Sequence, residues 1–257
     1  MAFDVAGEMY QRFMGRFSDP LAEPFADFAR VGHGSGMRVL DVGCGPGALS
    51  VELVQRVGVH RVTAVDPSEP FVTAARERLP GVDVQRAGAE ELPFADASFD
   101  AVLAQLVVQF MTDPAVGVAE MARVAKPGGV VAACVWDHGG RRGPLSPFWT
   151  AAAALDPAAP NEDRRVGAQE GDLEDLLRRA GLRDVTETGL TVTKHFATFE
   201  EWWEPFTFGV GPAGDYARTL DERGLAALRE QCRAVLPPEP FDLDATAWAA
   251  RGTGPAE

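Results

Sequence analysis

The chain has 257 residues, of which 46% are hydrophobic and 24% charged, an ordinary composition for a globular protein with a sizeable core. Its formal net charge of −14 would repel phosphate backbones, which argues against nucleic acid as a partner. Three cysteines without paired spacing predict neither a disulfide framework nor a metal site. Because no secretory signal and no apolar run of the ~20 residues that span a bilayer is visible, we expect a cytoplasmic protein.

Residues 1–35 are rich in aromatic side chains and predict a helical N-terminal arm. The next segment, 36–137, alternates short β-prone runs with helical patterns. The expected strands are 37–42, 61–65, 82–86, 99–107 and 130–136, and the expected helices are 46–57, 68–79 and 113–124. Strands joined through helices imply right-handed crossovers and a parallel sheet.

The C-terminal part of the chain alternates less regularly. Residues 138–171 hold many Gly, Pro and Ala and predict a loop. The remaining elements expected are a helix over 172–180, a strand within 182–196, helices over 199–208 and 217–235, and a last strand over 241–250. We therefore expect a single domain over residues 1–257. It would be an α/β fold with a seven-stranded, mostly parallel sheet, helices on both faces, and a cover formed by 138–171, 197–238 and the arm.

Residues 39–47 are the most informative stretch. An apolar run that carries Asp41 is followed by three glycines at alternate positions, the first two being Gly43 and Gly45, and then by a helical pattern. This is strand, tight turn and helix N-terminus, where an α/β sheet brings bare backbone against a nucleotide-like ligand. Asp66 follows at the tip of the second strand, where a carboxylate can accept both hydroxyls of a ribose.

Two classes of cofactor share this frame, the nicotinamide or flavin dinucleotides and S-adenosylmethionine. Asp41 would oppose the pyrophosphate of a dinucleotide, but it would attract the ammonium and sulfonium groups of S-adenosylmethionine. An NAD-dependent oxidoreductase remains an alternative, although neither Tyr10 nor Tyr216 has the Lys four residues later that the common hydride site needs.

Four motifs, in the expected order, resemble those of the class I S-adenosylmethionine-dependent methyltransferases, in the branch that contains quinone C-methyltransferases and many small-molecule methyltransferases. They are VLDVGCGPG at 39–47, VDPS at 65–68, AEELPF through SFD over 89–100, and EMARVAKPGG at 120–129. The resemblance implies a Rossmann-like fold. It also implies methyl transfer from S-adenosylmethionine to an O-, N- or C-nucleophile of a small molecule. A catalytically silent S-adenosylmethionine-binding protein is the second alternative.

The resemblance also implies which residues contact the cofactor. Asp41 and the glycine turn would face its methionine portion, Asp66 would hold the ribose and Pro67 would lie against the adenine. Gly88 stands where the family often has an Asp that bonds the adenine amino group, so Glu90 or the backbone would replace that contact. The predicted cofactor-binding residues are Arg16, Asp41, Gly43, Cys44, Gly45, Asp66, Pro67, Ala89, Glu90, Gln105 and Leu106.

Arg16 belongs to a run that resembles an arm folding over the cofactor, where a planar guanidinium would pair with the methionine carboxylate. The alternative is a solvent-facing arginine on a surface helix. Tyr10 lies in the same run, and we expect it to contact the acceptor.

His138 directly follows the fifth strand and is the candidate general base, because an imidazole titrates near neutral pH. A loop histidine without a chemical role is the alternative. Trp149 and Trp202 lie in the expected cover, where they would contact an apolar acceptor or simply pack the cover onto the core. Transfer from a sulfonium chiefly requires alignment, so the absence of a catalytic triad does not argue against it. The oligomeric state stays open.

Overall fold

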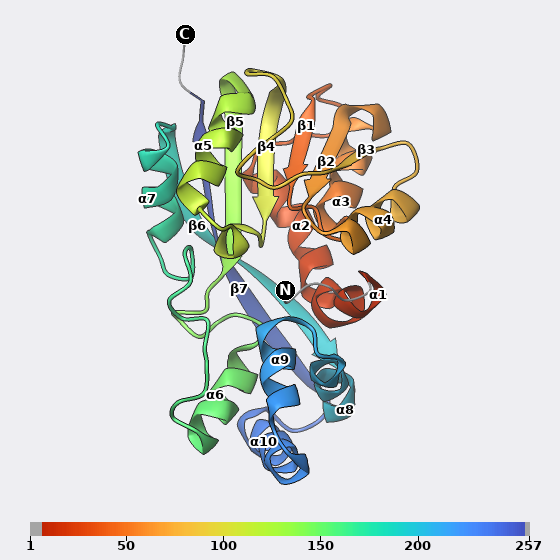
Figure 1. Cartoon of the computed structure of the whole chain (residues 1–257), viewed down its shortest axis with the longest axis vertical. Helices are drawn as coiled ribbons and strands as arrows, with labels where there is room; N and C mark the ends of the chain where they lie inside the picture. Colours follow the sequence, from red (N-terminus) through yellow and green to blue (C-terminus); the bar gives the residue numbers. More distant parts are fainter. Residues whose placement is uncertain (1–6, 255–257) are drawn as a thin grey trace.

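The computed structural model describes residues 7–254, which form a seven-stranded sheet with helices around it (Figure 1). Residues 1–6 of the predicted arm and residues 255–257 lie outside the described part of the chain. The strands stand in the order β3-β2-β1-β4-β5-β7-β6, and β7 runs antiparallel to β5 and β6. The strands are β1 (Val39–Val42), β2 (Val62–Asp66), β3 (Asp83–Arg86), β4 (Phe99–Gln105), β5 (Ala125–Trp136), β6 (Arg183–Phe196) and β7 (Phe241–Thr253). The predicted mostly parallel sheet is confirmed.

Helices cover both faces of the sheet because its central strands are apolar on both sides. Along β4, Ala101 and Leu103 belong to the same apolar cluster as the buried residues of α2 and α3. Val102 and Ala104 point the other way and pack with α5 and α7. The helices of the core are α2 (Arg16–Phe28), α3 (Ala48–Val57), α4 (Glu69–Arg78), α5 (Pro114–Val124) and α7 (Asp172–Arg179). Alternate residues of one strand therefore serve two separate packing layers.

A second group of helices lies beyond the carboxyl ends of the parallel strands (Figure 1). We call this group the cover; it consists of α6 (Ser146–Leu155), α8 (Phe199–Trp203), η4 (Glu204–Phe208), α9 (Gly211–Thr219) and α10 (Glu222–Val235). Its interior is aromatic: the Phe148 and Phe206 rings stack 4.7 Å apart, and Trp202 lies 4.6 Å from Phe206. The long strands β6 and β7 connect the cover to the core (Figure 1).

The N-terminal arm lies between the core and the cover. Its elements are α1 (Gly7–Tyr10) and η1 (Gln11–Gly15), followed by α2. Phe13 packs edge-on against Phe206 of the cover, with the ring centres 5.1 Å apart. Tyr10 packs against Phe71 of α4 at 5.1 Å. The arm therefore contacts both halves of the molecule.

Three expectations differ from the structure. The predicted loop over 138–171 contains a helix, α6, because its alanine-rich run is a good helix former and Pro147 stands in the first turn, where proline is tolerated. The helix expected over 217–235 is divided into α9 and α10, because the Asp221 side chain accepts the Gly224 N–H and caps a new helix start. The fifth strand, expected over 130–136, begins earlier, because residues 126–129 are also part of β5, which shifts register beside β4.

Within residues 7–254, no helix is both long enough and apolar enough to cross a membrane.

Candidate active site

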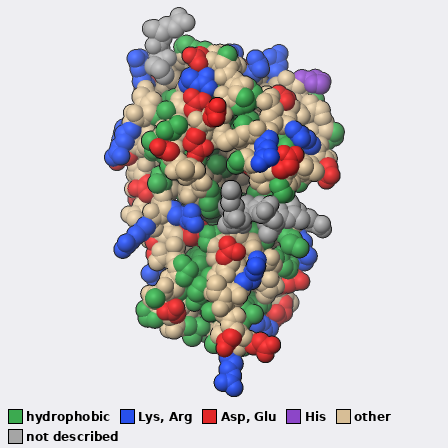
Figure 2. Space-filling view, in the orientation of Figure 1, with side chains coloured by type: hydrophobic (Ala, Val, Ile, Leu, Met, Phe, Trp, Pro, Cys, Tyr) green, Lys and Arg blue, Asp and Glu red, His purple; other side chains and the backbone are tan. Residues whose placement is uncertain are grey.

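A cavity of about 740 Å³ lies at the carboxyl ends of β1, β2 and β4. Figure 2 shows the surface hollowed between the two halves of the molecule. Tyr10 and Gln11 bring the arm to its wall. All the predicted cofactor-binding residues except Arg16 line this cavity, namely Asp41, Gly43, Cys44, Gly45, Asp66, Pro67, Ala89, Glu90, Gln105 and Leu106. The structure thus brings together residues at the carboxyl ends of four different strands.

The glycine turn uses its own N–H groups within the protein. The N–H groups of Gly43 and Cys44 both donate to the Val65 carbonyl, and the Gly45 N–H donates to Asp66 at 2.9 Å. The Gly47 N–H donates to the Cys44 carbonyl, and residue 46 is a proline, which has no N–H. Residues 43–47 therefore present no unused N–H group to a pyrophosphate. The groups of the turn that remain are carbonyl oxygens, which accept hydrogen bonds and so suit a cationic ligand better than a pyrophosphate.

A side chain is disfavoured at Gly43 and at Gly45 of the turn for different physical reasons. Gly43, at φ +70°, would bring a Cβ within 2.5 Å of the Val107 side chain, so this position is closed by packing inside the protein. Gly45, at φ +54°, would direct a Cβ into open space in the cavity wall. Of these two, Gly45 is the position where bare backbone is exposed to a ligand.

Asp66 is buried at the tip of β2, and both of its oxygens are held. Its Oδ2 accepts the Gly45 N–H at 2.9 Å, and its Oδ1 accepts the Ser68 N–H at 2.8 Å. Burial raises the pKa of the Asp66 carboxyl, and these two hydrogen bonds oppose that rise. Since each carboxylate oxygen can accept a second bond, Asp66 keeps the capacity to bind two hydroxyl groups.

Asp41 is 1% exposed at the end of β1, and its Oδ2 accepts the Ser50 hydroxyl at 2.5 Å. The pKa of Asp41 is raised to about 7, chiefly by burial and also by the charge of Asp66, while the hydrogen bond from Ser50 opposes the rise. A cation placed in the cavity would favour the charged form of Asp41. This acid therefore suits the ammonium of a ligand.

The end of β4 is held in an unusual conformation. Leu106 has φ +63°, the left-handed region that a leucine rarely adopts. Gln105 donates through Nε2 to the Ser18 carbonyl at 2.9 Å and so ties α2 to this strand. The Gln105 Oε1 is buried and has no partner among the described residues. A buried acceptor at the cavity wall fits a bound ligand that donates a hydrogen bond.

Glu90 holds the acidic loop against the segment before α5. Its Oε1 accepts the N–H groups of Thr112 and Asp113 at 2.7 and 3.3 Å. Its Oε2 lies 3.3 Å from the position that a Cβ on Gly88 would take. The carboxylate of Glu90 is thus next to the position where the family often has an Asp.

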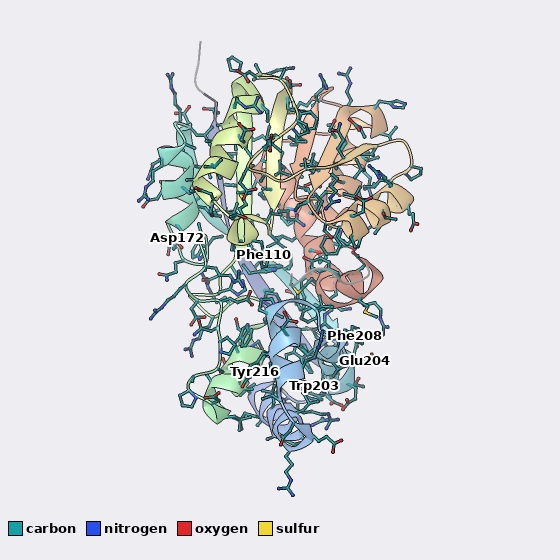
Figure 3. The ribbon with its side chains drawn as sticks, viewed as in Figure 1. Phe110, Asp172, Trp203, Glu204, Phe208 and Tyr216 are labelled. Carbon is teal, nitrogen blue, oxygen red and sulfur yellow. The ribbon has the colours of Figure 1, made fainter. Side chains whose placement is uncertain are left out.

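A smaller chamber of about 40 Å³ lies between the arm, the core and the cover, and it shares Tyr10, Leu106 and Phe110 with the larger cavity. Figure 3 shows Phe110 at the junction of the core and the cover. His138 lines this chamber and is 6% exposed. Burial lowers the pKa of His138, so the imidazole is neutral near neutral pH and can accept a proton.

The chain is similar to known proteins whose family is defined. Residues 40–133 match the family model described as "Methyltransferase domain". The chain is 39% identical over 127 residues to a malonyl-[acyl-carrier protein] O-methyltransferase of Erwinia pyrifoliae, covering 45% of this chain and 48% of that protein. It is 30% identical over 207 residues to an uncharacterized protein of Mycobacterium tuberculosis, covering 77% of this chain and 73% of that protein. The chain belongs to the class I S-adenosylmethionine-dependent methyltransferases.

The fold agrees with this family. A putative methyltransferase from Bacillus halodurans superposes with a TM-score of 0.58 and 19% identity, covering 91% of this chain and 99% of that one. The chain spans 48% and 41% of the lengths of the first two curated relatives. The family uses S-adenosylmethionine as its cofactor. Membership of this family therefore argues against the alternative of an NAD-dependent oxidoreductase. The buried acids, the open Gly45 and the unpaired Gln105 oxygen fit that cofactor.

In this methyltransferase, Arg16 lies away from the cofactor cavity. Its guanidinium donates to the carbonyls of Glu201 and Trp202 at 3.0 and 3.3 Å, and it lies 5.0 Å from the Phe196 ring centre. Burial lowers the pKa of Arg16 to about 10. Arg16 is half-buried and is bonded to the cover, and it is not among the residues that line the larger cavity. It fastens the arm to the cover.

Two predicted acceptor residues are also placed elsewhere. Trp149 and Trp202 are buried, and neither is among the residues that line the two cavities. Trp149 donates to Glu162 at 3.1 Å, and Trp202 packs on Phe206. Their positions match the packing alternative, since aromatic side chains fill the interior of the cover. Trp203, Phe208 and Tyr216 also lie in the cover (Figure 3).

Some residues that line the two cavities were not predicted from the sequence. Gln11 and Ser18 come from the arm, and Phe71 comes from α4, five residues after Asp66. Gln109 and Glu162 line the smaller chamber. Phe71 was detectable from its place after the acid motif. The others follow no pattern in the sequence, because their position depends on how the arm and the cover pack.

Proposed function

We propose that this protein transfers the methyl group of S-adenosylmethionine to a small-molecule acceptor. The single observation that carries the proposal is the shared wall of the two cavities, formed by Tyr10, Leu106 and Phe110. A donor in the larger cavity and a nucleophile in the smaller chamber would meet there. S-adenosylmethionine supplies a methyl group on a positively charged sulfur, which is already a good leaving group.

The cofactor would be held by the groups that line the larger cavity. Asp66 would accept the ribose hydroxyls with the lone pairs that Gly45 and Ser68 leave unused. Asp41 would stabilise the ammonium group through its charge, and the backbone at Gly45 would approach the methionine portion. Glu90, beside Gly88, would accept a hydrogen bond from the adenine amino group, in place of the Asp that the family often has.

On the acceptor side, we assign His138 as the general base. It lies in the smaller chamber, it is buried, and its neutral imidazole can take the proton of a hydroxyl or amine as the new bond forms. The net charge of −14 supports a small molecule rather than a nucleic acid as the acceptor. The expected cytoplasmic location stays a prediction.

Titration calorimetry with S-adenosylhomocysteine and with NAD tests the cofactor site, and we expect binding of the first compound only. Methyl transfer to a panel of phenols, quinols and amines then tests catalysis. His138→Ala should lower turnover roughly a hundredfold, the low end of the range for general bases. Full turnover of His138→Ala would refute the base assignment. Tight S-adenosylhomocysteine binding without any transfer would favour the silent binding protein instead.

A further inference from the structure

The smaller chamber contains two buried polar groups that have no partner among the described residues. One is the Oε1 of Gln109, a side chain that is 9% exposed, and the other is the indole N–H of Trp136, which is 2% exposed. Both residues line the chamber. Buried polar groups are usually satisfied in native proteins, so each of these unpaired groups calls for an explanation.

The orientation of Gln109 is fixed by its other end. Its Nε2 donates to the Leu106 carbonyl at 3.1 Å. Because a carbonyl oxygen can only accept, the amide nitrogen must face Leu106, and the oxygen must be the unpaired end. Leu106 itself is held at φ +63° and lines both cavities. Gln109 therefore carries a buried, unpaired acceptor of fixed identity on a residue that lines the chamber, next to Leu106, which lines both cavities.

The charges around the chamber disfavour an anion. Among the described residues that line it, none is Lys or Arg, and Glu162 is the one carboxylate. Glu162 already accepts the Trp149 N–H at 3.1 Å and pairs with Arg165 at 3.4 Å. Arg165 also donates to the Gln109 backbone carbonyl at 3.2 Å, but its charge is matched by Glu162. A buried anion would therefore face a like charge without an unmatched cation on the chamber lining, which is unfavourable.

The rest of the chamber is apolar and narrow. Its volume of about 40 Å³ has room for about three water molecules. Phe13, Met14, Leu145 and Val210 form much of its wall. The chamber therefore accommodates a small polar group on an apolar body, rather than a long polar chain.

We propose that this chamber binds the nucleophilic end of an uncharged acceptor, and that Gln109 is a specificity-determining residue that accepts a hydrogen bond from the acceptor's hydroxyl or amino group in the bound state, before His138 takes the proton that leaves during transfer. A hydroxyl also accepts hydrogen bonds, so the Trp136 N–H can be satisfied by the same group. This inference rests on the function proposed above and specifies its acceptor class. It makes Gln109, rather than Trp149 or Trp202, the polar contact that selects the acceptor.

Three monosubstituted benzenes test the proposal: phenol, toluene and benzoate. Their dissociation constants are measured by ligand-observed NMR on the chain loaded with S-adenosylhomocysteine. We expect phenol to bind at least about tenfold more tightly than benzoate, because the carboxylate lacks a cationic partner. Gln109→Leu should weaken phenol binding about fivefold relative to toluene, since it removes one hydrogen bond. Gln85→Leu, the same change on β3 outside the chamber, should leave both constants unchanged.

Equal binding of phenol and benzoate, or an unchanged phenol-to-toluene ratio in Gln109→Leu, would overturn the proposal. Binding of S-adenosylhomocysteine is measured for each variant, and Gln109→Met provides a second apolar replacement, with an unbranched side chain. If both Gln109 variants lose S-adenosylhomocysteine binding, Gln109 supports the cofactor site and the proposal is wrong. Failure of the unmodified chain to bind S-adenosylhomocysteine would overturn the proposed function and this inference together.

Discussion

In the larger cavity, the buried acids are hydrogen-bonded by residues that lie in the same or an adjacent strand–turn–helix unit of the chain. Asp66, for example, is bonded by Gly45 and Ser68 at the ends of adjacent strands. In the cover, the interior is a stack of aromatic rings, and its polar contacts join distant segments, as when Arg16 bonds the carbonyl of Glu201. The half of the molecule that holds the larger cavity is therefore specified locally, whereas the cover depends on packing between remote segments.

The largest effect should come from the interior of the cover. Trp202 is fully buried, so Trp202→Ala should lower the free energy of unfolding by about 3–5 kcal/mol, measured by denaturant unfolding. Trp202→Phe keeps most of the volume and should cost less. S-adenosylhomocysteine binding to the folded Trp202→Phe chain should stay within about twofold, because distant sites act independently. A large loss of cofactor affinity in this variant would show that the two halves are coupled.

Asp66→Ala should change ligand binding at the larger cavity, in the core half of the molecule. Removal of the charged contact to two hydroxyls should weaken S-adenosylhomocysteine binding by about 2 kcal/mol, or roughly thirtyfold, as measured by calorimetry. Asp83→Ala, at the exposed start of β3, is the matched control and should not change affinity. An unchanged dissociation constant for Asp66→Ala would refute the ribose assignment.

The pH dependence should report on Asp41. A cation favours the carboxylate, so binding needs the deprotonated form, and affinity should rise about tenfold between pH 6 and 8 around a pKa of about 7. In the cofactor-free chain, the folded state holds this proton more tightly than the unfolded state. The free energy of unfolding should therefore fall as the pH rises from about 4 to about 7. Both trends should flatten in Asp41→Asn, and their persistence there would assign them to another group.

The smallest effect tests whether the glycine turn contacts the cofactor. Gly45 and Gly36 both have positive φ, +54° and +71°, and both have open space at the Cβ position. Gly45→Ala and Gly36→Ala should each cost about 1 kcal/mol of stability through backbone strain. Only Gly45→Ala should weaken S-adenosylhomocysteine binding, by about fivefold, because its methyl group enters the cavity. Equal affinities would mean that the turn is purely structural. Gly43 is unsuitable for this test, since its Cβ would collide with Val107.

Much of the core was predictable because its signals are local. The apolar strands, the glycine turn and the acid at the tip of β2 lie in consecutive βαβ units, and the carboxyl ends of parallel strands meet at one edge of a sheet. The same rule brought Gln105 and Leu106 to the cavity. Helix α6 was not predicted, because the Gly and Pro residues of 138–171 are typical of a loop. Its alanine-rich run nevertheless favours a helix.

The amino-acid sequence by itself determined the fold class, the family and most of the cofactor cavity, because those features depend on residue periodicity and short motifs. Only the tertiary structure decided the roles of Arg16, Trp149 and Trp202, which lie in the arm and the cover rather than at a strand end. It also showed the smaller chamber with Gln109 and His138. That chamber is assembled from segments far apart in the chain, so its members become neighbours only when the arm and the cover pack against the core.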